Sequence, residues 1–205
     1  TSGFHRNPEV YRYTFPDFIM YFGHGNGCWK DRMQYQMLQI AFLEGMKFDI
    51  QRIKDDGAAL HWLRDPLRKW FFRAEYRHNI GVDIRNGTGS RWRCFYTDTE
   101  ENHALTVSLC DVPENAVLTF DRSRYGTYEK ALFFREDGTA EALPVAEGNS
   151  VVLPSCRSAV LLLCSKCSDD RSFWLQAIPA GERKLRISAM PVGTDSRSEE
   201  RRVGK

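Results

Sequence analysis

The chain has 205 residues, of which 42% are hydrophobic, enough to bury a core and too many for an intrinsically disordered chain. Its 29 lysines and arginines nearly balance 27 aspartates and glutamates, so the formal net charge is only +2. This balance argues against a nucleic-acid-binding role, and the longest apolar run is far shorter than the roughly 20 residues that span a bilayer. We therefore expect neither a nucleic-acid partner nor a membrane partner.

The first eighty or so residues show the pattern of alternating strands and helices. Residues 18–22 form an apolar run that ends at a glycine, which predicts a strand buried on both faces. Apolar side chains recur at helical spacing over 31–46, and residues 47–50 indicate another short strand. Strand, glycine-rich loop, helix and strand within about 30 residues match a βαβ unit.

Two further helices are expected before the pattern changes. Residues 56–63 predict a short helix, and Asp65-Pro66 is a strong start signal for a second helix that runs to about residue 79. Its apolar stripe includes Trp70 and Phe71. The basic residues around this stripe are expected on a solvated face: Arg64, Arg68, Lys69, Arg73 and Arg77.

Beyond Gly81 the hydrophobic period changes to two, which is typical of strands. Turn signals such as Asn86-Gly87-Thr88-Gly89 separate the segments. Many short strands without a helical pattern among them predict an antiparallel sandwich. The expected strands are residues 93–97, 104–109, 116–121, 130–135, 150–153, 158–164, 173–177 and 185–189.

The loop over residues 23–30 is the most suggestive candidate site. In parallel α/β folds, substrates meet the loops that leave the C-terminal ends of the strands. Glycines allow this loop to bend sharply, while His24, Asn26, Trp29 and Lys30 supply polar and stacking groups for substrate binding. The alternative is a loop whose glycines only satisfy a turn and whose tryptophan packs on the neighbouring helix.

Carboxylates follow the second predicted strand. Asp49 lies within that strand, and Asp55 and Asp56 come just after it. Glycoside hydrolysis needs two carboxylates flanking one bond, so Asp49 is a further substrate-site candidate. Asp56 equally suits the cap of the next helix, and Glu44 is interpreted as structural because it falls on a predicted helix.

The six cysteines are too sparse for a secreted disulfide scaffold. Cys164 and Cys167 form one C-x-x-C without a second pair or nearby histidines, so no metal site is expected. Buried, reduced cysteines lean towards a cytoplasmic protein. No motif indicates a cofactor. The tryptophans suit sugar stacking or, more commonly, core packing: Trp62, Trp70, Trp92 and Trp174.

The segments over 8–18, 42–48 and 67–77 resemble the last units of a bacterial glycoside-hydrolase-like barrel of the α-galactosidase type. In such proteins an arginine-rich closing helix leads into a C-terminal β-sandwich. The resemblance implies an α/β part followed by an all-β part. The α/β part comprises the last βα units of a TIM-type barrel over 1–82, and the all-β part is an antiparallel β-sandwich over 83–190. It also implies hydrolysis of a carbohydrate substrate by two carboxylates without metal or organic cofactor. Those carboxylates typically lie on earlier barrel strands, so no catalytic pair is assigned in this chain.

Residues 191–205 are expected to form a disordered tail, and residues 197–205 resemble the in-frame translation of a sequencing-library adapter. We therefore expect natural sequence to end near residue 195 or 196 and the chain to be a fragment that is inactive alone. The alternative function is a non-catalytic β-sandwich module that binds carbohydrate or protein.

Overall fold

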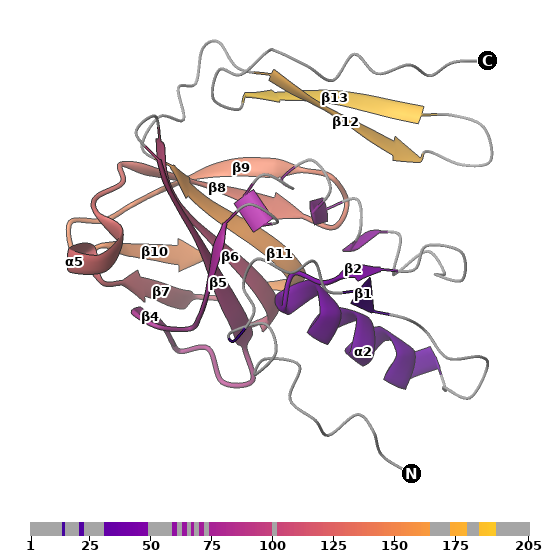
Figure 1. Ribbon diagram of the computed structural model, residues 1–205, viewed down its shortest axis with the longest axis horizontal. Helices are drawn as coiled ribbons and strands as arrows, with labels where there is room; N and C mark the ends of the chain where they lie inside the picture. The colour runs from indigo at the N-terminus through magenta and orange to yellow at the C-terminus, as the bar shows by residue number, and fades with distance from the viewer. Residues whose placement is uncertain are drawn as a thin grey trace. The chain divides into compact units, whose positions relative to one another are not determined.

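The computed structural model describes Thr14 and residues 21–22, 31–48, 59–60, 63–64, 67, 70–71, 74–99, 102–164, 173–179 and 185–191 (Figure 1). The chain divides into two compact units, Thr1–Ser165 and Lys166–Lys205. None of the helices in the described part is long and apolar enough to cross a membrane.

The N-terminal part of the first unit contains one βαβ unit. Strand β1 (Tyr21–Phe22) and strand β2 (Lys47–Phe48) pair in parallel, and helix α2 (Asp31–Leu43) connects them. This confirms the strand–helix–strand order predicted from the apolar runs. The helix ends three residues earlier than predicted, at Leu43.

Helix α2 ends in a Schellman motif centred on Gly45. The Met46 N–H donates to the Ala41 carbonyl at 2.9 Å, and the Gly45 N–H donates to the Phe42 carbonyl at 3.1 Å. Gly45 has φ +65°, the left-handed conformation that this motif requires and that glycine adopts without penalty. The glycine that weakens the helix in the sequence is therefore the residue that terminates it.

Two antiparallel sheets make up most of the first unit. The small sheet has the order β10-β7-β4 and the large sheet has the order β3-β5-β6-β11-β8-β9. A short helix, α5 (Arg122–Tyr125), follows β7. The strands are β3 (Glu75–His78), β4 (Val82–Arg85), β5 (Arg91–Thr99), β6 (Asn102–Val112), β7 (Ala116–Phe120), β8 (Lys130–Arg135), β9 (Ala140–Pro144), β10 (Ser150–Leu153) and β11 (Cys156–Cys164).

The inner face of the large sheet packs against the small sheet, which makes a β-sandwich. Alternate residues of the central strands point into the shared core, as the two-residue period of a strand requires. The large sheet contributes Leu105, Val107, Leu109, Ala159, Leu161 and Leu163, and the small sheet contributes Ile84, Leu118, Val151 and Leu153.

The outer face of the large sheet is buried as well. Leu162 on β11 and Thr106 on β6 belong to the set of residues that points away from the sandwich core, yet both are at most 1% exposed. Helix α2 packs against β5 and β6 (Figure 1). Its buried side chains are Tyr35, Leu38, Gln39, Ala41, Phe42 and Leu43. The central strands are therefore buried on both faces.

The second unit contains one antiparallel hairpin. Strand β12 (Phe173–Pro179) pairs with β13 (Leu185–Pro191), from Phe173 opposite Pro191 to Pro179 opposite Leu185. Together with the sandwich strands, this hairpin confirms all eight strands that the two-residue period predicted.

The predicted fold class, with the last units of a TIM-type barrel, is wrong. The described residues form mainly antiparallel sheets, with nine strands in two sheets, and the parallel pairing is limited to the two-residue strands β1 and β2. Helix α2 covers an antiparallel sheet instead of the outside of a barrel. A helix with one apolar face looks the same in sequence whichever kind of sheet it covers.

The predicted helix over 66–79 is also wrong in its last turn, because residues 75–78 form β3. Tyr76 is buried against Phe95 of the neighbouring strand, with ring centroids 5.5 Å apart. Strand pairing with β5 thus overrides the helical pattern. Arg64, expected on a solvated face, is buried and donates a hydrogen bond to the Met46 carbonyl.

Candidate functional site

The substrate-site residues predicted from the sequence lie outside the described part of the chain. These are His24, Asn26, Trp29, Lys30 and Asp49. The structure does describe Glu44 and a set of polar residues that the sequence did not single out. They gather where helix α2 crosses the outer face of the large sheet.

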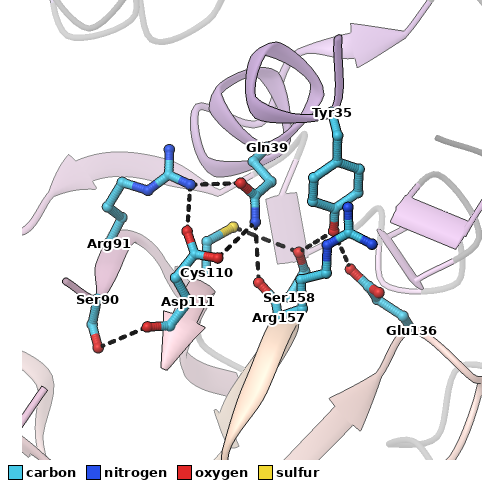
Figure 2. Close-up of polar contacts among 9 residues, drawn as sticks. All are labelled: Tyr35, Gln39, Ser90, Arg91, Cys110, Asp111, Glu136, Arg157 and Ser158. Atoms are coloured by element: carbon cyan, nitrogen blue, oxygen red, sulfur yellow. Dashed lines mark hydrogen bonds and ion pairs between the residues drawn. The ribbon is translucent and has the colours of Figure 1, made fainter. Parts of the chain in front are cut away.

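The first group, here called the Gln39 cluster, consists of Gln39, Arg91, Asp111 and the Arg157 carbonyl (Figure 2). Arg91 Nη2 donates to Gln39 Oε1 and to Asp111 Oδ2, each at 2.6 Å. Gln39 Nε2 donates in turn to Asp111 Oδ1 at 3.3 Å and to the Arg157 carbonyl at 3.2 Å. The amide of this buried side chain is therefore bonded through both its oxygen and its nitrogen, which removes the cost of burying it.

Asp111 reaches this cluster through an unusual backbone conformation. Its φ is +56°, in the left-handed region that aspartate tolerates better than most residues. The conformation falls near the end of β6, and Asp111 is followed by Val112, which belongs to the sandwich core. Ser90 Oγ donates to the Asp111 carbonyl at 3.4 Å (Figure 2). This hydrogen bond joins the turn before β5 to the end of β6, beside the contact between Asp111 and Gln39 of α2.

The second group, here called the Tyr35 cluster, lies one helical turn earlier. The Tyr35 hydroxyl donates to Glu136 Oε1 at 2.6 Å and lies 3.0 Å from Ser158 Oγ. The Arg157 guanidinium lies over the Tyr35 ring, 3.2 Å from its centroid, as a cation–π contact (Figure 2). Burial and the hydrogen bond to Glu136 raise the pKa of Tyr35 well above its ordinary value, so this phenol stays protonated.

The third group, here called the Glu44 cluster, lies just beyond the C-terminus of α2. Glu44 Oε1 accepts from Arg93 Nε at 2.7 Å, and Glu44 Oε2 accepts from the Tyr76 hydroxyl. The Glu44 side chain is 2% exposed and that of Arg93 is 16% exposed. One carboxylate oxygen thus forms a partly buried ion pair and the other accepts a hydrogen bond from a phenol. Glu44 was interpreted as structural because it falls on a predicted helix; it follows α2 instead of lying within it, and its structural role stays a prediction that these contacts agree with.

Ser108 links the same helix end to two strands. Its hydroxyl contacts the Leu43 carbonyl at 3.1 Å and the Arg93 carbonyl at 3.2 Å. The carbonyl groups at a helix C-terminus have no partner within the helix, and a buried one needs a donor from elsewhere. The serine on β6 therefore helps to dock the end of α2 on the sheet.

The four described cysteines are free thiols, and three of them are buried: Cys94, Cys110 and Cys164. This agrees with the expected reduced, buried state for these positions. Burial raises the pKa of Cys110 to about 12 and that of Cys156 to about 12, so both thiols are protonated and unreactive near neutral pH.

The described residues contain no group of three metal-ligating side chains. Trp70 is buried, and Trp92 packs against the sandwich core while its indole Nε1 donates to the Val82 carbonyl at 3.2 Å. For these two tryptophans the core-packing interpretation is confirmed. Trp62 and the side chain of Trp174 lie outside the described part.

Comparison with protein-family models, with curated proteins and with solved structures found no match to this chain.

The three clusters bind a helix to a sheet, and their polar groups are satisfied mainly by one another. A carboxylate that acts in catalysis needs an oxygen directed at the substrate, whereas the Glu44 oxygens contact Arg93 and Tyr76. The sequence held one signal for these groups. Tyr35 and Gln39 occupy the buried helical positions beside Leu38 and Phe42, where apolar residues would be expected.

Proposed function

We propose that this chain is a non-catalytic β-sandwich module that binds protein, with its large sheet holding a helix-bearing segment in a fixed orientation. The double burial of the large sheet supports the part of the proposal that concerns the fixed orientation of α2. One face makes the sandwich core and the other receives α2 through the three polar clusters.

The polar contacts explain why the docking is specific. Apolar packing alone tolerates sliding of a helix along a sheet, because the hydrophobic effect has no directional preference. The Gln39 amide fits one position only, between Arg91 on β5 and Asp111 on β6. The Tyr35 hydroxyl adds a second fixed point on β11, at Ser158. Two fixed points one helical turn apart determine both the position and the rotation of α2.

The described face of the small sheet gives no support to carbohydrate binding, which leaves protein as the ligand that we propose. The exposed face of the small sheet carries Asp83, Arg85, Thr119 and Val152, none of which can stack on a sugar ring. The tryptophans that the structure describes, Trp70 and Trp92, are used in packing. A sugar platform would need an aromatic face directed outward.

The sequence resemblance to glycoside-hydrolase-like proteins implies a wider setting for this module, which stays a prediction because the barrel units behind the resemblance are not found among the described residues. In this setting the complete protein is a carbohydrate-active enzyme that hydrolyses a glycosidic bond with two carboxylates, and the sandwich serves as its accessory part. The catalytic carboxylates then lie outside the sandwich. The carbohydrate is the substrate of the complete protein.

Hydrogen exchange of the full chain tests the docking role. Replacing Gln39 with alanine removes the central amide of the cluster, and we expect faster exchange throughout α2 with β11 unchanged. Gln36→Ala is the matched control, because Gln36 is exposed on the same helix. If α2 exchanges at the wild-type rate in Gln39→Ala, or if α2 and β11 change together, the proposed docking role is wrong.

Incubation of the full chain with chromogenic glycosides tests the absence of catalysis. We expect no turnover. Hydrolysis that is abolished by Glu44→Gln, with the fold intact by circular dichroism, would overturn the non-catalytic assignment.

A further inference from the structure

The loop between β4 and β5 carries an Asn–Gly step on the surface. Asn86 is exposed and has φ +55°, and Gly87 follows it with Gly89 two residues further on. The Ser90 N–H donates to the Gly87 carbonyl at 2.8 Å and closes the turn. This asparagine does not belong to any of the clusters that dock α2.

The fold itself requires a glycine at position 87. A Cβ atom added to Gly87 would lie 2.4 Å from Ile84 Cγ2 and 2.9 Å from Ser90 Oγ. Ile84 is a core residue on β4 and cannot move away without disturbing the sandwich. The residue after Asn86 therefore has no side chain to shield its backbone nitrogen. Among the backbone–backbone hydrogen bonds of the described turns and loops, none has the Gly87 N–H as its donor.

From this combination we propose that Asn86 is a site of spontaneous deamidation. The Gly87 backbone nitrogen loses its proton and attacks the Asn86 side-chain carbonyl carbon. A carbon–nitrogen bond forms, the bond to the amide nitrogen breaks, and ammonia leaves after taking up a proton. Water then opens the five-membered succinimide to give either aspartate or isoaspartate at position 86. Solvent supplies the water, and no electron is transferred.

Other asparagines in the described part lack the glycine. Asn115 is the closest match because it is also exposed and has φ +60°, but the buried Ala116 follows it. A Cβ on the following residue hinders the attack of its nitrogen on the asparagine side chain. Comparing Asn86 with Asn115 therefore isolates the effect of Gly87 within a single molecule.

The reaction changes the charge and backbone of this loop. Each event replaces a neutral amide with a carboxylate and lowers the formal net charge from +2 to +1. The new carboxylate follows directly on Arg85, the last residue of β4. Isoaspartate also inserts one extra carbon into the backbone, next to the turn that Ser90 closes.

The test is peptide mass spectrometry of the folded full chain after incubation, with electron-transfer fragmentation to separate aspartate from isoaspartate. We expect the fraction of the Asn86 peptide that has gained one mass unit to grow about tenfold faster than the corresponding fraction of the Asn115 peptide. The rate should increase from mildly acidic to mildly alkaline buffer, because the attacking nitrogen must lose a proton. Asn86→Ser removes the reacting group and should abolish the mass change.

The urea-unfolded chain serves as a reference, because it reports the reactivity of the Asn–Gly sequence without the fold. We expect the folded rate to be within about tenfold of the unfolded rate, since the loop is exposed. If the folded loop reacts as slowly as Asn115 while the unfolded chain reacts quickly, the loop conformation protects Asn86 and the proposal is wrong.

Discussion

Replacing Gly45 with alanine tests how closely helix α2 approaches the large sheet. Gly45 lies in the left-handed region at φ +65°, and an added Cβ would lie 2.8 Å from Phe95 Cε1. The Phe95 ring is itself confined, with Phe71 at 4.9 Å and Tyr76 at 5.5 Å between ring centroids. The substitution therefore combines a backbone penalty with a steric one.

The two contributions can be estimated separately. A left-handed L-residue costs about 1–2 kcal/mol, and overpacking a tight core site costs about 1–3 kcal/mol more. We expect Gly45→Ala to lower the free energy of unfolding by about 2–5 kcal/mol in total. Gly89→Ala is the control, because Gly89 also has positive φ, at +88°, but nothing lies within 4 Å of its added Cβ. We expect Gly89→Ala to lower the free energy of unfolding by the backbone penalty alone, about 1–2 kcal/mol.

Urea denaturation followed by tryptophan fluorescence and circular dichroism measures both variants, with the free energies compared at an unchanged m-value. The difference between Gly45→Ala and Gly89→Ala gives the cost of the clash with Phe95. If the two variants are equally destabilised, Phe95 yields freely and the helix end is not pressed against the sheet as the structure indicates.

Two further predictions concern charged and titratable groups. Glu44→Gln removes the carboxylate charge that faces Arg93, whose side chain is 16% exposed, and should lower the free energy of unfolding, by about 3 kcal/mol. Glu75→Gln, in an exposed ion pair, should cost less than about 1 kcal/mol. Burial raises the pKa of Cys110 from 9.0 to about 12, so above about pH 9 the unfolded chain releases this proton first and stability falls as the pH rises. Denaturation in reducing buffer at increasing pH should show this decline, and Cys110→Ala should lessen it.

Equal losses in Glu44→Gln and Glu75→Gln would mean that the buried pair contributes no more than a surface pair. An alkaline decline of unchanged steepness in Cys110→Ala would show that this thiol does not contribute to it.

The strands of the sandwich could be predicted from the sequence because their signal is local. The two-residue alternation over 116–121 and 150–153 appears in the structure as β7 and β10. Strand β9 was missed, since Ala140–Pro144 lacks β-branched residues and is paired only with β8 at the edge of the sheet. Strand β3 was missed because its residues continue a helical pattern.

The candidate site could not be predicted, because its contacts join distant parts of the chain. Gln39 and Asp111 are 72 residues apart, and Tyr35 and Ser158 are 123 residues apart. No spacing rule along the sequence relates such pairs. Besides the polar residues at apolar positions of α2, a second clue was the unbroken apolar run 159–164, which is longer than a strand with one solvated face would show. It marks β11 as buried on both faces, without revealing what covers the second one.

The sequence by itself determined eight of the strands, the βαβ unit around α2, and the burial of Cys94, Cys110 and Cys164. Only the tertiary structure decided that α2 covers an antiparallel sheet, that Tyr76 joins that sheet, and that Glu44 pairs with Arg93. The periodicity of apolar residues shows which face of a helix or strand is apolar, because that face is made by residues only a few positions apart in the sequence. The identity of the surface on the other side depends on long-range packing, and the order of residues carries no direct record of it.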